Sequence, residues 1–159
     1  MKIILLVDDD REVRETLGEM LVSLGYQVIA RSDAIAALAV LRVGATIDLV
    51  ITDNRMPETD GMEFIVQLKR RLPNVPVIML TGYGAVETYL KALSIGVFEY
   101  LNKPIMKRDL ERIVHAALRS VEECPACRVD HDVSTDGTAK RHRTPVRSTR
   151  KSERVSAVE

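Results

Sequence analysis

The chain of 159 residues is poor in several residue types that would point to particular classes of protein. It has no tryptophan, two phenylalanines and four tyrosines, and none of these lies in the basic stretch Lys140–Arg154, which therefore has no ring to stack on nucleic acid bases. Its two cysteines, Cys124 and Cys127, cannot form a disulfide framework. The longest apolar run, Ala34–Leu41, is far shorter than the ~20 residues of a membrane-spanning helix, and no signal peptide is visible. We therefore expect a cytoplasmic protein without a membrane partner.

Charge is balanced overall but unevenly distributed along the chain. Lys and Arg total 23, as do Asp and Glu, yet from Cys124 onward eight basic residues stand against five acidic ones. Residues 128–159 also contain no Leu, Ile, Phe, Met, Tyr or Trp, and such a segment buries too little apolar surface to fold. We predict one folded domain over residues 1–123. Residues 124–159 are predicted to form a disordered, basic tail without an effector domain.

The tail leaves two binding roles open as alternatives. Cys124 and Cys127, with His131 and His142, could supply the four ligands of a zinc site. The basic stretch Lys140–Arg154 could contact nucleic acid through charge alone, although it lacks the aromatic residues and the apolar period of a recognition element. A pair of reduced thiols at a helix end and a solvated tail are the simpler interpretations, and nucleic acid binding is not favoured.

Short apolar runs alternate with amphipathic stretches throughout the predicted domain. The runs are typical of buried strands, and the stretches have the apolar spacing of helices. The predicted strands are Ile3–Val7, Tyr26–Ala30, Ile47–Thr52, Val77–Leu80 and Val97–Leu101. The predicted helices span residues 13–24, 33–43, 62–72, 85–95 and 110–121. This alternation predicts an α/β fold, a doubly wound five-stranded parallel sheet with helices on both faces.

Polar side chains follow the predicted strands at the points where they end. These residues are Asp8, Asp9, Arg31, Ser32, Asp53, Thr81 and Lys103. In an open parallel sheet, ligands bind outside the carboxyl ends of the strands. We therefore expect three carboxylates, a hydroxyl and an ammonium group to converge at one edge of the sheet.

The residue types at this edge indicate phosphoryl chemistry. Clustered carboxylates repel one another unless a cation joins them, and Mg²⁺ prefers such oxygen ligands together with phosphate oxygens. Lysine adds a positive charge for an anion, and threonine can donate a hydrogen bond to it. Together they could form a phosphoryl site in which one carboxylate is the nucleophile.

Four stretches of the sequence, each at a predicted strand end, resemble the receiver domain of two-component response regulators. The matching stretches are Leu5-Leu6-Val7-Asp8-Asp9, Asp53 with Met56-Pro57 and Asp60-Gly61, Thr81-Gly82, and Tyr100 with Lys103-Pro104. The resemblance covers about residues 2–122. It implies the strand order 2-1-3-4-5 and a phosphorylation-controlled switch rather than an enzyme, with only self-catalysed phosphoryl transfer and hydrolysis.

The resemblance also implies how the phosphoryl group is received. Asp53 would be the phosphoacceptor, taking the group from a sensor histidine kinase or a phosphotransfer protein. Asp9, Asp53 and the backbone carbonyl of Arg55 would ligate Mg²⁺, and Asp8 would hold the ion through water. Gly82 would leave room for the phosphoryl group.

Three further residues would pass the signal on. Lys103 would pair with Asp53 and later with the phosphoryl group, and Thr81 would donate a hydrogen bond to that group. Tyr100 would swing inward as the readout, and the Lys103–Pro104 bond would be cis. The resemblance implies signalling to an unidentified output protein through the surface around the fourth helix, the fifth strand and the fifth helix. It leaves open a homodimer formed on phosphorylation.

Other interpretations remain for the same residues. The chain could be an interaction module that keeps the fold and works without phosphorylation, although the intact set of polar residues argues against this. A Mg²⁺ phosphatase would need a cap over its substrate, and no insertion is long enough to supply one. Asp10 or a neighbour is expected to cap the first helix, and Tyr100 could simply pack in a strand. We also expect the bulky Arg55 and Tyr83 to shield an aspartyl phosphate from water.

Overall fold

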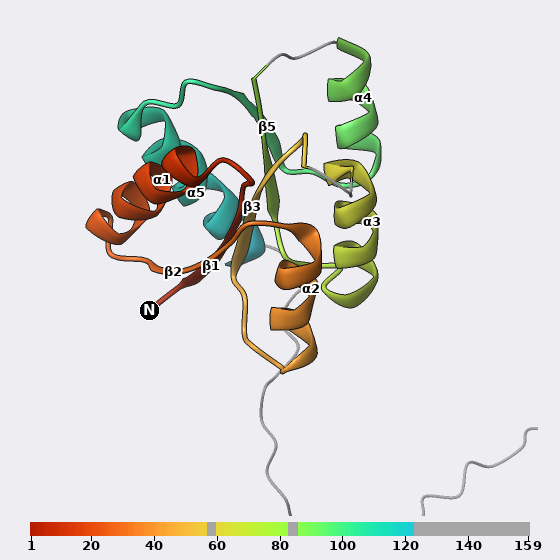
Figure 1. Cartoon of the computed structure of the whole chain (residues 1–159), viewed down its shortest axis with the longest axis horizontal. Coiled ribbons are helices and arrows are strands. Elements are labelled where there is room, and N and C mark those ends of the chain that lie inside the picture. The colour runs from red at the N-terminus through yellow and green to blue at the C-terminus, as the bar shows by residue number, and fades with distance from the viewer. Residues whose placement is uncertain (57–59, 83–85, 123–159) are drawn as a thin grey trace, which may run out of the picture. The chain divides into compact units, whose positions relative to one another are not determined.

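The computed structural model of the protein describes residues 1–56, 60–82 and 86–122, without the side chains of residues 86–89 (Figure 1). The predictions for Tyr83, for the cysteine pair Cys124 and Cys127 and for the tail over 124–159 concern residues outside these ranges. No helix in the described part of the chain is both long enough and apolar enough to cross a membrane.

Five parallel strands form a single sheet in the order β2-β1-β3-β4-β5. The strands are β1 (Ile3–Val7), β2 (Gln27–Arg31), β3 (Leu49–Asp53), β4 (Val77–Thr81) and β5 (Glu99–Asn102). Both the predicted fold class and the predicted strand order are confirmed. Strand order reverses between β1 and β3, so the carboxyl ends of these two strands flank the point where ligands bind in such sheets.

In the described part of the chain, four helices connect successive strands and a fifth follows β5, and together they cover both faces of the sheet. They are α1 (Arg11–Ser23), α2 (Ala34–Arg42), α3 (Gly61–Arg71), α4 (Val86–Ser94) and α5 (Lys107–Glu122). Helices α1 and α5 lie on one face, and α2, α3 and α4 lie on the other (Figure 1). The sheet is therefore the middle of three layers.

The core is divided into two clusters because side chains alternate across a strand. In β1, Ile4 and Leu6 pack with residues of α1 and α5, whereas Leu5 and Val7 pack with residues of α2 and α3. All four side chains are fully buried. This burial on both faces explains why the strands appear in the sequence as continuous apolar runs rather than as alternating patterns.

Two strands begin two residues later than predicted, for reasons that lie outside their own sequence. The backbone N–H of Asp48 donates to the carbonyl of Ile3, and its carboxylate accepts from the N–H of Ile3 at 2.8 Å. Asp48 thus joins β1 partly through its side chain, and β3 starts at Leu49. Val97 donates its N–H to the carbonyl of Ala92 near the end of α4, and β5 starts at Glu99. Val97 still packs in the core.

Aspartates define the starts of the helices that follow the first three strands. Asp10 caps α1 as predicted, accepting from the backbone N–H groups of Glu12 and Val13 at 2.9 and 3.2 Å. Asp33 and Asp60 cap α2 and α3 in the same way. These caps hold the helices at the edge of the sheet where the polar residues gather.

Candidate functional site

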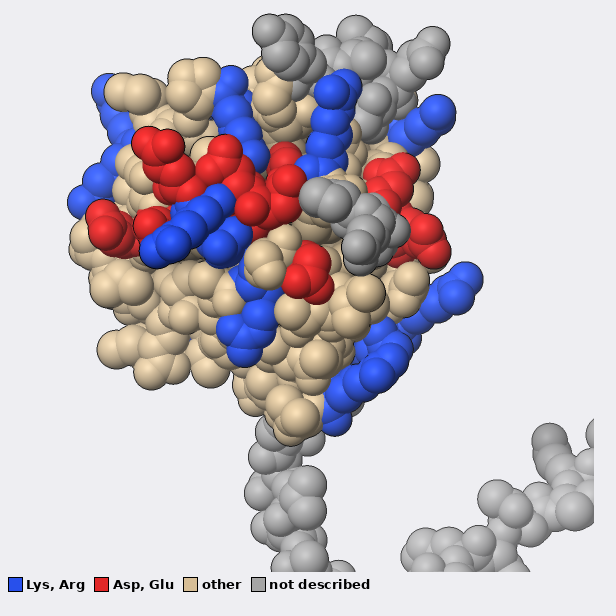
Figure 2. All heavy atoms as spheres, in the orientation of Figure 1, with Lys and Arg blue, Asp and Glu red and all other residues tan. Residues whose placement is uncertain are grey.

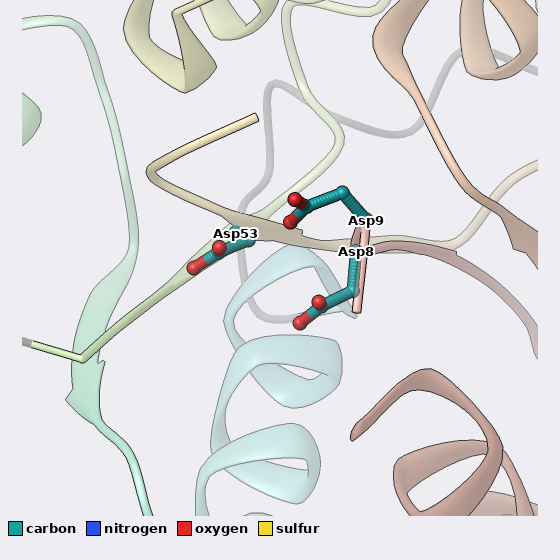
Figure 3. A group of neighbouring side chains, drawn as sticks. All are labelled: Asp8, Asp9 and Asp53. Carbon is teal, nitrogen blue, oxygen red and sulfur yellow. The ribbon is translucent and has the colours of Figure 1, made fainter. Parts of the chain in front are cut away.

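Three carboxylates meet at the carboxyl edge of the sheet (Figure 3). Asp8 and Asp9 directly follow β1, and Asp53 is the last residue of the neighbouring β3. One oxygen from each side chain lies within 4.8 Å of the other two. Asp8 and Asp53 are buried, at 0% and 7% exposed, and Asp9 is open to solvent. Of these three carboxylates, two are therefore enclosed and one is accessible.

Lys103 brings a positive charge to the two buried carboxylates. Its Nζ lies 2.7 Å from Oδ2 of Asp8 and 3.3 Å from Oδ1 of Asp53. The residue follows β5, and its backbone N–H donates to the carbonyl of Thr81 at 2.7 Å. The Lys103–Pro104 peptide bond is cis, as predicted. The ammonium group thus bridges the ends of β1 and β3.

The charges of this cluster are strongly coupled. Burial raises the pKa of Asp53, attraction to Lys103 opposes the rise, and repulsion from Asp8 adds to it; the pKa is raised overall. Burial alone would lower the pKa of Lys103, but its hydrogen bond and attraction to Asp8, followed by those to Asp53, raise it. The lysine is therefore held firmly charged, whereas the charge on Asp53 is costly in the metal-free protein.

Asp53→Asn is expected to stabilise the metal-free protein at neutral pH. The folded protein holds the proton of Asp53 more tightly than the unfolded chain does, so ionisation of Asp53 lowers stability as pH rises above its ordinary pKa of 3.8. Thermal unfolding should show a higher melting temperature for the variant at pH 7.5, by a few degrees. The difference should shrink at pH 4.5. An equal or lower melting temperature at pH 7.5 would contradict this expectation.

Every polar group of Asp8 is engaged. Its Oδ1 accepts the backbone N–H of Asp10 at 3.0 Å, and its Oδ2 accepts from Lys103. Its backbone carbonyl accepts from Nη1 of Arg14 at 2.6 Å. Arg14 was not predicted from the sequence; its position six residues after Asp8, on a helix, is the signal that could have indicated it. The backbone N–H of Asp8 donates to the carbonyl of Arg31 at 3.2 Å. Asp8 is thus held by β2, by the start of α1 and by Lys103.

Thr81 and Tyr100 lie on the α2, α3 and α4 side of the sheet. Thr81 ends β4 and is 1% exposed; it follows Leu80, which faces the α1 and α5 side, so its own side chain faces the other way. The ring of Tyr100 packs against the core cluster on that face, and its hydroxyl oxygen is buried. The aromatic ring is therefore directed inward in this structure.

Two further predicted residues closely follow the ends of β3 and β4. Arg55 is exposed, two residues beyond Asp53, and pairs with Asp60 in an isolated β-bridge. Gly82 is exposed, and a Cβ at this position would meet no described atom within 4 Å. Within the described part of the chain, the structure thus gives no packing reason for glycine at position 82.

Gly61 has a steric role at this site that the sequence analysis did not identify. A Cβ at this position would lie 2.5 Å from the carbonyl oxygen of Asp53 and 2.8 Å from that of Asn54. The N–H of Gly61 also donates to the carbonyl of Asn54 at 3.1 Å. The start of α3 therefore closes directly onto the end of β3, and only a residue without a side chain permits this approach.

The donor set fits a divalent cation that prefers oxygen. Oxygens bound to Mg²⁺ lie about 2.0–2.1 Å from the ion, so ligands on opposite sides are about 4.2 Å apart. The separation of up to 4.8 Å between Asp8, Asp9 and Asp53 is close to this span. Figure 2 shows Asp and Glu side chains gathered in the upper half of the face in view, with Lys and Arg among them. This site can hold a cation beside an anionic group.

Comparison with known proteins finds many relatives of this chain. The model of the response regulator receiver domain matches residues 4–115. The response regulator protein FleR of Pseudomonas aeruginosa is 36% identical over 137 residues, which are 86% of this chain and 28% of FleR. The transcriptional regulatory protein FixJ of Bradyrhizobium diazoefficiens is 33% identical over 119 residues, 75% of this chain and 58% of FixJ. The chain therefore spans less than two thirds of either relative.

Solved structures give the same result for the fold. A response regulator receiver domain protein from Clostridium thermocellum has a TM-score of 0.73 and 31% identity, and the match covers 77% of this chain and 98% of that one. The chemotaxis protein CheY4 of Vibrio cholerae has a TM-score of 0.71 and 28% identity, covering 74% of this chain and 99% of that protein. Both structures are thus matched almost from end to end.

Proposed function

This chain belongs to the response regulator receiver family of two-component systems, and we propose that it is a phosphorylation-controlled switch whose phosphoacceptor is Asp53. One observation carries the proposal: a carboxylate at the end of a central strand lies 3.3 Å from a lysine ammonium group and beside two further carboxylates. The donor would be the phosphohistidine of a sensor histidine kinase or of a phosphotransfer protein, in the cytoplasm.

The transfer joins an oxygen of Asp53 to phosphorus as the bond between phosphorus and the histidine nitrogen breaks. The electron pair of that bond stays with the imidazole, which can take a proton from solvent, and Asp53 becomes an aspartyl phosphate. Lys103 already lies between Asp53 and Asp8, so its charge can follow the incoming anion. Asp8, Asp9, Asp53 and the carbonyl of Arg55 would hold Mg²⁺, which supplies positive charge beside the phosphoryl oxygens.

The switch would follow from the charge that the phosphoryl group adds, about −1.5 to −2 for a phosphoamino acid. Lys103 would move from its carboxylate partners towards the phosphoryl group. The hydroxyl of Thr81 would donate a hydrogen bond to that group. Because Thr81 and Tyr100 occupy the same side of the sheet, a shift of Thr81 can bias the packing of Tyr100 and α4. An output protein would then recognise the surface formed by α4, β5 and α5.

We divide the chain into two parts in this proposal. Residues 1–123 would be the receiver domain, and residues 124–159 a polar, basic tail. A phosphorylation-independent interaction module is the second candidate, but it does not explain why Lys103 and three carboxylates are kept together at the edge of the sheet.

Acetyl phosphate with Mg²⁺ provides the test, read out as the intact mass of the purified protein. We expect one phosphoryl adduct on the wild type and none on Asp53→Asn, because the substitution removes the nucleophilic oxygen. Asp48→Asn is the matched control, since it makes the same chemical change beside Lys2 at the amino ends of the strands, away from the site. An adduct that persists in Asp53→Asn would overturn the assignment.

A further inference from the structure

We propose that Arg14 is a positioning residue that fixes the direction of the Asp8 and Asp9 carboxylates, and so sets the affinity of the site for Mg²⁺. The inference rests on the proposed function, because it concerns the same metal site. Nη1 of Arg14 lies 2.6 Å from the carbonyl oxygen of Asp8 and 3.4 Å from that of Asp9. One guanidinium group therefore holds the backbone of both residues.

The backbone of Arg14 is fixed in α1, so its side chain can act as a brace that holds the segment that joins β1 to α1 in place. Its backbone N–H donates to the carbonyl of Asp10 at 3.0 Å, within the first turn of α1, and its side chain is half-buried. The side chain reaches back over this turn to the segment that joins β1 to α1. Since α1 packs firmly on the sheet through the buried Leu17 and Leu21, this segment is tied to a rigid element.

The two carboxylates depend on this brace to different degrees. The side chain of Asp8 is also held by Lys103 and by the N–H of Asp10. Asp9 is exposed, so the direction of its side chain depends mainly on where its backbone is held. Residues behind metal ligands commonly act in this way, and their loss weakens metal affinity 10–100-fold.

The charge of Arg14 and its positioning role predict opposite changes in Mg²⁺ affinity when the side chain is removed. Arg14 is a cation close to the carboxylates, and removing a nearby cation should strengthen the binding of Mg²⁺ if charge alone mattered. Removing the brace should weaken binding, because the carboxylates then lose their common direction. The sign of the change in affinity therefore separates the two.

Arg14→Ala should bind Mg²⁺ about tenfold more weakly than the wild type in a calorimetric titration without a phosphoryl donor. Arg14→Lys, which keeps the charge and one donor, should lie between them. Arg11→Ala is the matched control: Arg11 is on the same turn of α1, but its side chain is 81% exposed and pairs with Glu15 at 2.7 Å. Its affinity should be unchanged or slightly higher.

A second readout does not involve metal. The N–H of Asp10 donates to the carboxylate of Asp8, so its exchange with solvent, followed by NMR in the metal-free protein, should be faster in Arg14→Ala and unchanged in Arg11→Ala. Unchanged or tighter Mg²⁺ binding by a folded Arg14→Ala protein would overturn the proposal. A wild type that binds no Mg²⁺ would overturn the proposed function instead, and the exchange rates would then still decide whether Arg14 braces this segment.

Discussion

Gly61→Ala is expected to lower the free energy of unfolding by about 3 kcal/mol, the upper end of the usual cost of overpacking. The added Cβ would lie 2.5 Å from the carbonyl oxygen of Asp53 and 2.9 Å from Cα of Asn54. These are backbone atoms at the end of a central strand, so no side chain can rotate to make room. Chemical denaturation of the variant and the wild type would measure the loss.

The matched control is the same substitution at Gly18, in the interior of α1. A Cβ there would meet nothing described within 4 Å, and its backbone is helical. Gly18→Ala should therefore raise the free energy of unfolding by about 0.5–1 kcal/mol, because alanine loses less backbone entropy in a helix. If the two substitutions changed stability in the same direction by similar amounts, the close approach of α3 to β3 would not be what requires glycine at position 61.

Lys103→Met is expected to lower the free energy of unfolding by about 3 kcal/mol in the metal-free protein at neutral pH. The substitution keeps a side chain of similar length and removes the ammonium group 2.7 Å from Oδ2 of Asp8. Asp8 is fully buried, and the second partner of the lysine, Asp53, is 7% exposed. Two neighbouring buried carboxylates would then lack their cation. Thermal and chemical unfolding in the presence of a chelator would measure the effect.

Two rescues should distinguish this cause from a loss of packing. Millimolar Mg²⁺ should restore much of the stability of Lys103→Met by replacing the missing positive charge, and Asp8→Asn in the same background should restore it without metal. Lys69→Met is the control. Lys69 is also partly buried, but its Nζ donates to the carbonyls of Val75 and Pro73, and burial lowers its pKa. Lys69→Met should lower the free energy of unfolding by less than Lys103→Met does, and Mg²⁺ should not restore it. Equal stabilisation of both variants by Mg²⁺ would rule out the electrostatic explanation.

Local pattern in the sequence was sufficient to predict the alternation of strands and helices and the gathering of Asp8, Asp9, Asp53 and Lys103. Continuous apolar runs such as Ile3–Val7 predict strands buried on both faces, and parallel strands bring the residues at their carboxyl ends to one edge. Capping residues such as Asp10 indicate where the helices that follow begin. The strand order itself came from the resemblance to the receiver family, because the period of a strand does not reveal its neighbours.

Tertiary structure alone decided the features that depend on contacts between distant segments or on the reach of single side chains. Residue type at position 48 does not show that Asp48 would bind Ile3 and delay the start of β3. The sequence places Gly61 directly after the helix cap Asp60, but it does not show that a Cβ on Gly61 would lie 2.5 Å from the carbonyl oxygen of Asp53. Helical spacing places Arg14 on α1, but its hydrogen bonds to the carbonyls of Asp8 and Asp9 depend on how α1 packs against the sheet. Periodicity reports the burial of a segment, whereas the geometry of the site is set by where separate segments meet.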